Sequence, residues 1–126
     1  MKAKKLYFME CHLAGRKYHD VDLVWDDLTV GTKVRLVREP DNRYDANAVA
    51  IVYDKNEGDE TADEYLLGYI PSKENEVIAR FLDMGWDECF SCTISRKNPE
   101  AQYEEQIRLT VRINKNEEQN KRSSKN

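Results

Sequence analysis

The segment "QIRLTVRIN" (106–114) constrains the fold most, because apolar and polar side chains alternate along it without a break. Successive side chains of a β-strand point to opposite faces, so this pattern predicts a strand with one face in a core and the other in solvent. The core-facing side chains would be those of Ile107, Leu109, Val111 and Ile113. The segment therefore favours a β-rich fold.

Five further segments have strand character and are separated by short intervals. "TKVRLVRE" alternates in the same way, whereas "AVAIVYD" is a short apolar run rich in β-branched residues, which is typical of a central strand. The predicted strands cover 4–13, 32–39, 48–54, 65–70, 88–95 and 106–114. About six short strands without β-α-β alternation predict a mainly β fold, a small barrel; modified OB-like and SH3-like closures both fit this spacing.

One or two short helices are expected beside the strands. The apolar residues of 20–31 recur at helical intervals, which predicts one short helix. A clearer helix is predicted over 71–84, with Ser72 as its N-cap and Gly85 at its end. Trp86 follows this helix and is expected to pack back on the core.

The chain has 126 residues, a length that suits one domain with its own core. Residues 1–114 are expected to form the barrel domain, and the wholly polar stretch 115–126 a disordered tail. No segment approaches the roughly 20 apolar residues of a membrane span. The basic start lacks the apolar stretch of a signal peptide, and three cysteines, an odd number, point to a reducing cytoplasm.

The sequence offers little support for metal or hydrolytic chemistry. Cys89 and Cys92 form a C-x-x-C, but a zinc site needs two more ligands at matching spacing, and Cys11, His12 and His19 form no second pair. The chain has no phosphate-cradling glycine loop, no G-x-S-x-G and no paired helical histidines with a glutamate. We therefore expect no metal, no cofactor and no catalytic residue.

The formal net charge of -4 argues against a protein that coats duplex DNA by neutralising phosphates. It leaves room for a small pocket that holds one end of a nucleic acid, because local charge decides there. "RKYH" (16–19) interleaves basic and aromatic residues in a loop, as in sites that hold a phosphate and stack a base. Loops of this kind are also often basic without function.

The stretch "REPDNRYDANAVAIVYD" (38–54) carries more turn-forming side chains than an ordinary hairpin needs. Asn42, Asp45 and Asn47 can bond the backbone and hold tight turns. Tyr44 is not required for a turn, and beside Asp45 it offers a stacking face next to a hydrogen-bond acceptor. The pair is chemically suited to the sugar end of a nucleotide.

Three blocks together resemble the HIRAN domain in order and spacing: "LAGRKYHD", "LVREPDNRYDANAVAIVYD" and "LGYIPSKENEVIARFLDMG". The resemblance runs from about Leu6 to Ile113. It implies a modified OB-type barrel of about six strands with two helices. The family is best known attached to Swi/Snf-type remodelling ATPases, where it captures the 3′ end of single-stranded DNA at stalled replication forks. Short stand-alone bacterial members also exist, and the chain looks like one of them.

The resemblance also implies roles for individual residues. Tyr18 matches an aromatic residue that stacks on the terminal nucleotide, Lys17 a basic phosphate contact, and His19 a position that often holds a second aromatic. Tyr44 and Asp45 match the pair that holds the end, in which the carboxylate accepts a hydrogen bond from the free 3′ hydroxyl. Such a bond would select ends, since internal phosphodiesters have no hydroxyl to donate.

Other positions match the family pattern more loosely. Tyr69 stands where a human member of the family has a phosphate-contacting histidine. Lys73 lies one position from a second phosphate site, and Tyr103 replaces a stacking aromatic in the last hairpin. Lys17 stands in place of an arginine, and Arg43 where the family usually has proline. These departures imply weaker phosphate contacts and a looser turn.

The expected function is therefore a non-catalytic module that binds the 3′-hydroxyl end of single-stranded DNA in repair or fork processing. A separately encoded helicase or nuclease would be its partner. Two alternatives remain open from the sequence. One is a protein-interaction barrel with a vestigial pocket, and the other a metal-dependent hydrolase acting on nucleic-acid ends.

Overall fold

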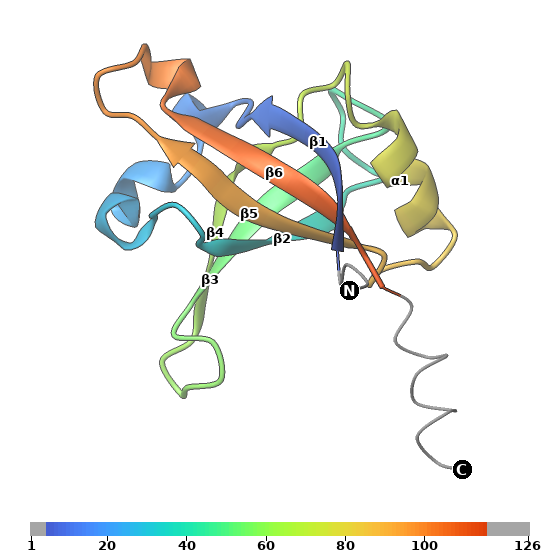
Figure 1. Cartoon of the computed structure of the whole chain (residues 1–126), viewed down its shortest axis with the longest axis horizontal. Helices are drawn as coiled ribbons and strands as arrows, with labels where there is room; N and C mark the ends of the chain where they lie inside the picture. Colours follow the sequence, from blue (N-terminus) through green and yellow to red (C-terminus); the bar gives the residue numbers. More distant parts are fainter. Residues whose placement is uncertain (1–4, 116–126) are drawn as a thin grey trace.

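The computed structural model describes residues 5–115 (Figure 1), and this part of the chain contains six strands, one α-helix and four single-turn 3₁₀ helices. The strands are β1 (Lys5–His12), β2 (Lys33–Arg38), β3 (Val49–Lys55), β4 (Asp63–Tyr69), β5 (Phe90–Lys97) and β6 (Ile107–Asn114). The helices are η1 (Arg16–Tyr18), η2 (Val21–Leu23), η3 (Trp25–Asp27), α1 (Glu76–Asp83) and η4 (Tyr103–Glu105).

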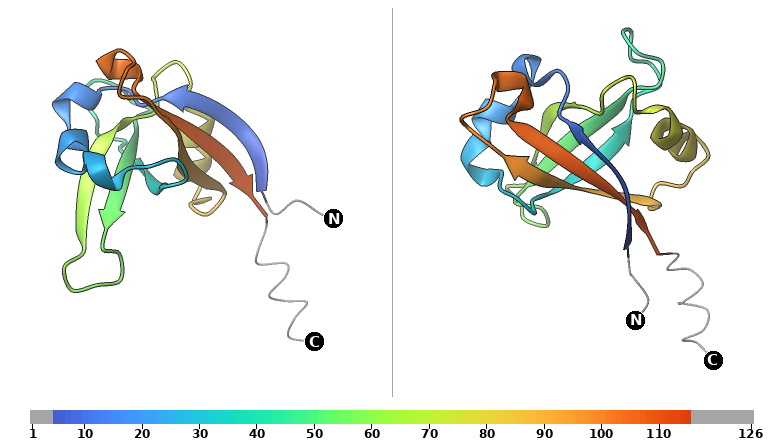
Figure 2. Two further views of the ribbon diagram at one scale, coloured as in Figure 1. Left: turned by 60° about the vertical axis from the view of Figure 1, so that its left-hand side comes forward. Right: turned by 45° about the horizontal axis from the view of Figure 1, so that its top comes forward.

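All strand pairs are antiparallel, and the strand order is β1-β6-β5-β2-β3-β4. The sheet curls, so that β1 and β6 lie across the molecule from β3 and β4 (Figure 2). Just beyond the end of β1, Ala14 exchanges two backbone hydrogen bonds of 2.9 Å with Tyr69 at the end of β4. This bridge joins the two outer strands and closes the barrel. The predicted mainly β barrel of six strands is thus confirmed.

Gly68 makes this closure possible. A Cβ at this position would lie 2.4 Å from the carbonyl oxygen of Ala14 and 3.0 Å from Cδ1 of Leu13. Real Cβ atoms do not approach a backbone oxygen so closely, so any side chain here would push the two segments apart. The glycine of "LGYI" therefore sets how near η1 can come to the end of β4.

The alternation of β6 places its side chains as expected, with one exception. Ile107, Leu109 and Val111 are buried in the core, and Arg108 and Arg112 face outward. Thr110 is also buried, at 5% exposure, although it lies on the polar face. It lies in the middle of the sheet, between Glu10 of β1 and Thr93 of β5.

The helices differ from the sequence prediction in two ways. Residues 20–31 form the two 3₁₀ turns η2 and η3 rather than one helix. The α-helix begins at Glu76, because residues 71–74 form a turn closed by a hydrogen bond from the N–H of Glu74 to the carbonyl of Pro71. Ser72 is therefore not its N-cap. Asn75 occupies that position, but its side chain does not cap the helix.

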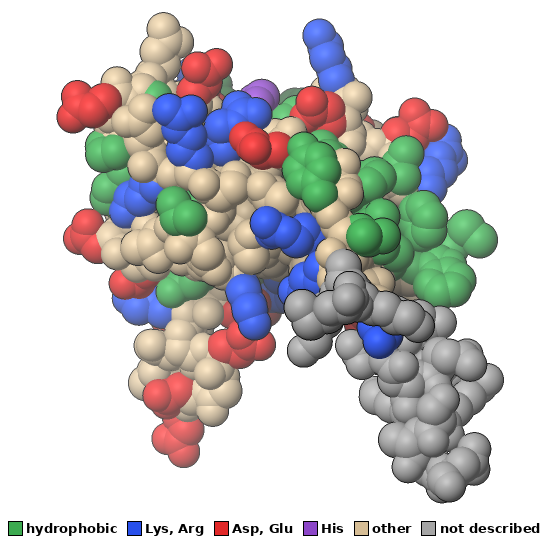
Figure 3. All heavy atoms as spheres, in the orientation of Figure 1, with side chains coloured by type: hydrophobic (Ala, Val, Ile, Leu, Met, Phe, Trp, Pro, Cys, Tyr) green, Lys and Arg blue, Asp and Glu red, His purple; other side chains and the backbone are tan. Residues whose placement is uncertain are grey.

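The outer side of α1 is apolar. Val77, Phe81 and Met84 are exposed there, and Trp86 is 56% exposed beside them, so the prediction that Trp86 packs on the core is wrong. Figure 3 shows apolar side chains gathered at this side of the molecule. The inner side of the helix packs Ile78 and Ala79 into the core.

Nearly all of the predicted polar tail, residues 115–126, lies outside the described residues. In the part of the chain that the structure describes, no helix is both long enough and apolar enough to cross a membrane.

Candidate nucleic-acid interface

The candidate residues come from three segments that meet at one rim of the barrel. They are η1 with His19, the β2–β3 loop (39–48), and the segment that leads from Tyr69 to Asn75. The β2–β3 loop projects from the body beside the segment that follows β4 (Figure 2, right). The bridge between Ala14 and Tyr69 holds the first segment against the third.

The β2–β3 loop is fixed by its own short side chains. Oδ1 of Asn42 accepts hydrogen bonds from the backbone N–H groups of Tyr44 (2.8 Å) and Asp45 (3.1 Å). Oδ1 of Asp45 accepts from the N–H of Asn47 at 2.9 Å. The expected hydrogen bonds from side chains to the backbone of the loop are thus present. Asp45, which was expected to face a ligand, makes one of them by bonding the backbone of Asn47. Asp45 therefore has a structural role in the loop.

Asp45 also ties the loop to the helix. Its Oδ2 accepts a hydrogen bond of 2.7 Å from Nδ2 of Asn75, a residue with no exposed surface. The half-buried carboxylate thus accepts one protein hydrogen bond on each oxygen. A carboxylate has about four lone-pair sites, so each oxygen keeps capacity for one further donor. Asp45 can hold the loop and still accept a bond from a ligand.

Tyr69 connects η1 with the β2–β3 loop. Its ring meets that of His19 edge-on, with the ring centroids 5.4 Å apart. Its hydroxyl donates a 2.8 Å hydrogen bond to Oε1 of Glu39, which also accepts from Nδ2 of Asn42 at 3.1 Å. Burial, together with this hydrogen bond to Glu39 and the negative charge of the carboxylate, raises the pKa of Tyr69 to about 12.

This arrangement changes the role inferred for Tyr69. Its hydroxyl already donates its hydrogen bond to Glu39, and the negative charge of this carboxylate repels a phosphate. Tyr69 and His19 are therefore better suited to positioning the two loops than to contacting a phosphate. Sequence reasoning missed Glu39, because its link to Tyr69 exists only once β2 and β4 are placed in the barrel.

Two tyrosine rings stand free at the rim. Tyr44 is 89% exposed, and the guanidinium of Arg43 lies 5.9 Å from its ring centroid. Tyr18 is 74% exposed, and Nζ of Lys17 lies 5.1 Å from its ring centroid. Each exposed ring is thus accompanied by a cation from the neighbouring residue. Lys73 is exposed as well, in the turn before α1.

Tyr103 is engaged with the protein. Its ring stacks on the guanidinium of Arg16 at 3.9 Å, and its hydroxyl donates to Asp22 at 2.7 Å. Arg16 is 3% exposed, its guanidinium also lies 4.7 Å from the ring centroid of Trp25, and it forms an ion pair with Asp22. Tyr103 therefore helps to anchor the buried arginine that begins η1. It lies near the candidate rim without presenting a free face like those of Tyr18 and Tyr44.

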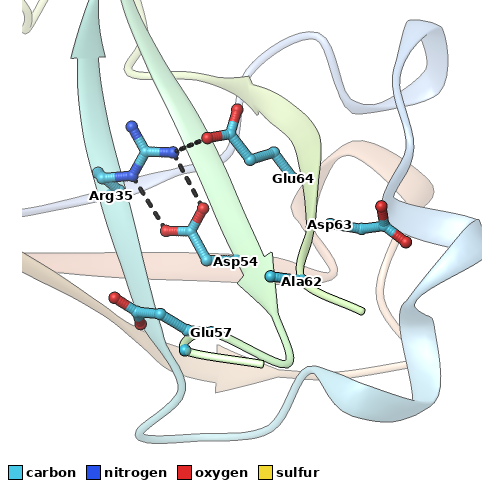
Figure 4. A pocket seen from close by; sticks show the side chains of 7 residues that line it. Arg35, Asp54, Glu57, Ala62, Asp63 and Glu64 are labelled. Atoms are coloured by element: carbon cyan, nitrogen blue, oxygen red, sulfur yellow. Dashed lines mark hydrogen bonds and ion pairs between the residues drawn. The ribbon is translucent and has the colours of Figure 1, made fainter. Parts of the chain in front are cut away.

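Two shallow pockets accompany these features. One of about 310 Å³ lies within the rim, beside 39–42. The other, of about 340 Å³, lies at the β3–β4 hairpin, where Arg35 pairs with Asp54 and Glu64 while Asp63 points away from that group (Figure 4). The negative surface of this hairpin is unsuited to phosphates. Within residues 5–115, no three His, Cys, Asp or Glu side chains are grouped so as to hold a metal ion.

Comparison with known proteins gives a consistent result. The family model described as "HIRAN domain" matches residues 6–115. A Fanconi-associated nuclease 1 homolog of Oryza sativa subsp. japonica is 30% identical over 82 residues, which are 65% of this chain and 8% of that protein. The homolog of Arabidopsis thaliana is 30% identical over 96 residues, 74% of this chain and 9% of its own length. The chain thus spans less than a tenth of these relatives.

Two crystal structures share the fold. A protein from Lactobacillus plantarum superimposes with a TM-score of 0.67 at 23% identity, covering 86% of this chain and 94% of that one. The HIRAN domain of human HLTF gives a TM-score of 0.61 at 18% identity, covering 94% and 86%. HIRAN domains bind nucleic acid and occur in nuclease and helicase proteins. Since the family model covers nearly all of the described residues, the chain belongs to the HIRAN domain family.

Proposed function

We propose that this chain is a non-catalytic module that captures the 3′-hydroxyl end of single-stranded DNA at the rim formed by η1, the β2–β3 loop and the turn before α1. The observation that carries the proposal is the pair of exposed rings of Tyr18 and Tyr44, each beside a cation, on two loops that are linked through Tyr69. Exposed aromatic rings with cations beside them suit stacked bases and their phosphates.

Each residue would have a distinct task in this proposal. Tyr18 and Tyr44 stack on bases, and each stacked base contributes roughly 1–3 kcal/mol. Lys17, Arg43 and Lys73 neutralise phosphates near the end. The remaining capacity of Asp45 accepts a hydrogen bond from the 3′ hydroxyl and repels a terminal phosphate. His19, Glu39 and Tyr69 hold the two loops at a fixed separation, and Tyr103 anchors η1.

The test compares oligonucleotides that end in a 3′ hydroxyl or a 3′ phosphate, by fluorescence anisotropy at one salt concentration. We expect the hydroxyl form to bind roughly 5- to 150-fold more tightly, because a terminal phosphate cannot donate the hydrogen bond to Asp45 and repels its carboxylate, at a cost of about 1–3 kcal/mol. Asp45→Asn should reduce this preference. Asp41→Asn, which removes the same charge from the same loop, is the matched control and should keep it.

Equal affinity for the two ends in the wild-type protein would contradict the proposal. Tyr18→Ala and Tyr44→Ala should each weaken binding by roughly 5- to 150-fold, in line with the loss of one stacked base. If both variants bind DNA normally, the rim is not the binding site and a protein-interaction role gains weight. Incubation of labelled DNA with Mg²⁺ or Mn²⁺ should give no cleavage product, and a product would contradict the non-catalytic assignment.

The cellular role is part of the same proposal. The plant relatives are Fanconi-associated nuclease 1 homologs, in which the matching segment is a small part of a much longer chain. We propose that this module brings DNA ends to a nuclease or helicase during repair. We expect such an enzyme to co-purify with the chain in the presence of DNA. This co-purification should be lost when Tyr18 and Tyr44 are replaced by alanine, and also when DNA is removed.

A further inference from the structure

The outer face of the β1-β6-β5-β2 part of the sheet carries a concentration of positive charge. The strand register places Arg112 opposite Tyr7 and Ser91, Arg108 opposite His12 and Arg96, and Lys33 opposite Thr93. The neighbours of these residues along each strand, such as Val34 and Leu109, point into the core. We call the outward group the basic sheet face, which consists of Lys5, Lys33, Arg96, Arg108 and Arg112.

Acidic side chains offset this charge at Arg108, which interacts with Glu10 and Glu105. On this face of the described strands the acidic residue is Glu10, which pairs with Arg108 at 2.5 Å. Arg112 donates a hydrogen bond to the hydroxyl of Thr93, which leaves its charge uncompensated. Figure 3, which views this side of the molecule, shows Lys and Arg side chains spread across it. In a chain of net charge -4, this concentration is local and opposite in sign to the whole.

The cross-strand pairing of these cations destabilises the sheet when no anion is bound. Arg96 and Arg108 lie directly opposite each other on β5 and β6, and like charges in this position destabilise a sheet. Glu10 can neutralise only one of them. A bound polyanion would relieve the repulsion. The face also presents flat rings among its cations, since Tyr7 is 67% exposed and His12 is half-buried beside Arg108.

Strand β1, which carries part of the basic sheet face, leads directly into the candidate rim. The last residue of β1 is His12, and residues 13–15 lead from it directly into η1. Ala14, within this connection, forms the bridge to Tyr69. A strand whose 3′ end lies at the rim can therefore continue along β1 and β6, from the pair of His12 and Arg108 toward that of Tyr7 and Arg112.

We infer that the basic sheet face binds the sugar-phosphate backbone of the nucleic acid on the 5′ side of the captured end. This inference rests on the proposed function and extends it, because it assigns a second contact surface away from the rim. The rim would read the end of the strand, and the sheet face would add affinity that is independent of sequence. A nucleic acid fits better than an acidic peptide, because Arg108 and Arg112 of β6 lie opposite the rings of His12 and Tyr7 on β1, so that cations for phosphates stand beside flat rings for bases.

The experiment measures binding of the full chain to 3-nucleotide and 15-nucleotide oligonucleotides, both with a 3′ hydroxyl, across a salt series. Arg96→Ala/Arg112→Ala should weaken binding of the longer strand roughly tenfold and lower its salt slope by about 1.4, since each phosphate contact on a single strand contributes about 0.7. Binding of the 3-nucleotide strand should not change. Thermal melts should first show that the variant is folded.

The matched control is Lys55→Ala/Arg80→Ala. It removes two positive charges that lie elsewhere, in ion pairs with Asp27 and Glu76. The inference is overturned if the control and the sheet-face variant bind the longer strand with the same affinity and slope. It is also overturned if the sheet-face variant loses binding of polyglutamate but keeps that of the longer strand, since the surface would then serve an acidic protein.

The two proposals fail separately. Equal binding of 3′-hydroxyl and 3′-phosphate ends refutes end reading at the rim, whether or not the length dependence persists. An unchanged salt slope in the sheet-face variant refutes the second surface, even where the preference for a 3′ hydroxyl is retained.

Discussion

Replacement of Gly68 by alanine should disrupt the closure of the barrel. The added methyl carbon would lie 2.4 Å from the carbonyl oxygen of Ala14 and within 3.1 Å of two side-chain atoms of Leu13, which is 1% exposed. That carbonyl oxygen is also the acceptor for the N–H of Tyr69. Neither the backbone nor the buried leucine can move aside without breaking the bridge between Ala14 and Tyr69.

The expected loss of stability follows from these contacts. Forcing an extra carbon into a packed interior costs about 1–3 kcal/mol. The two hydrogen bonds of the bridge contribute about 0.5–1.5 kcal/mol each, and part of this is lost as the segments separate. The free energy of unfolding should thus fall by about 2–5 kcal/mol. For a domain of this size, that corresponds to a decrease in Tm of roughly 8–20 °C.

Thermal unfolding followed by circular dichroism measures this effect. The matched control is Gly58→Asn, at a glycine of the β3–β4 hairpin with φ of 86°, where an added Cβ would meet no other part of the chain within 4 Å. Asparagine tolerates that backbone conformation, so the control should change the free energy of unfolding by less than about 1 kcal/mol. A Gly68→Ala variant that melts within about 3 °C of the control, roughly 1 kcal/mol, would refute the reasoning.

Three further predictions concern buried or half-buried groups. The phenol of Tyr69 should ionise with a pKa of about 12 in an absorbance titration, and Glu39→Gln should lower this pKa toward 10 without reaching it, because burial remains. Because the pKa of Tyr69 is higher in the folded than in the unfolded state, Tyr69 stabilises the fold below pH 10 and loses this contribution as the pH rises through 12. An unchanged pKa of Tyr69 in Glu39→Gln would contradict the role given to Glu39. Burial raises the pKa of Cys11 and Cys92 to about 12, so neither thiol should react with a disulfide reagent at about pH 8 until the protein unfolds, and rapid labelling of either would argue against their burial. Arg16→Ala should lower the free energy of unfolding by roughly 2–4 kcal/mol in a denaturant titration, because it removes two cation-π contacts and buried hydrogen bonds, and a loss below about 1 kcal/mol would disprove its role as an anchor.

The strands could be predicted because their signal is local. Alternation in 106–114 and the apolar run before Asp54 depend on neighbouring residues alone, and each produced a strand where it was expected. The start of α1 could not be predicted in this way. The side chain of Asn75, at the N-cap position, does not cap the helix but donates a hydrogen bond to Asp45, a residue 30 positions away.

The same division applies to the candidate site. Exposed Tyr18 and Tyr44 were singled out because their neighbours in the sequence have a recognisable pattern. The partners of Tyr69 and Tyr103 came from distant segments, and these partners decide that both hydroxyl groups are already engaged. Residue type and spacing thus identified the segments of the rim, whereas the fold determined which side chains are free to meet a ligand.

The position of β6 between β1 and β5 has a consequence for biosynthesis. The first and fifth strands have no direct pairing with each other, and the final strand supplies the partner for both. During synthesis, residues 5–97 can therefore leave the ribosome before β6 does, and the edges of β1 and β5 that pair with β6 then have no partner. Cooperative folding must wait until Asn114 has left the exit tunnel, so this late interval is when a nascent chain most needs protection from aggregation.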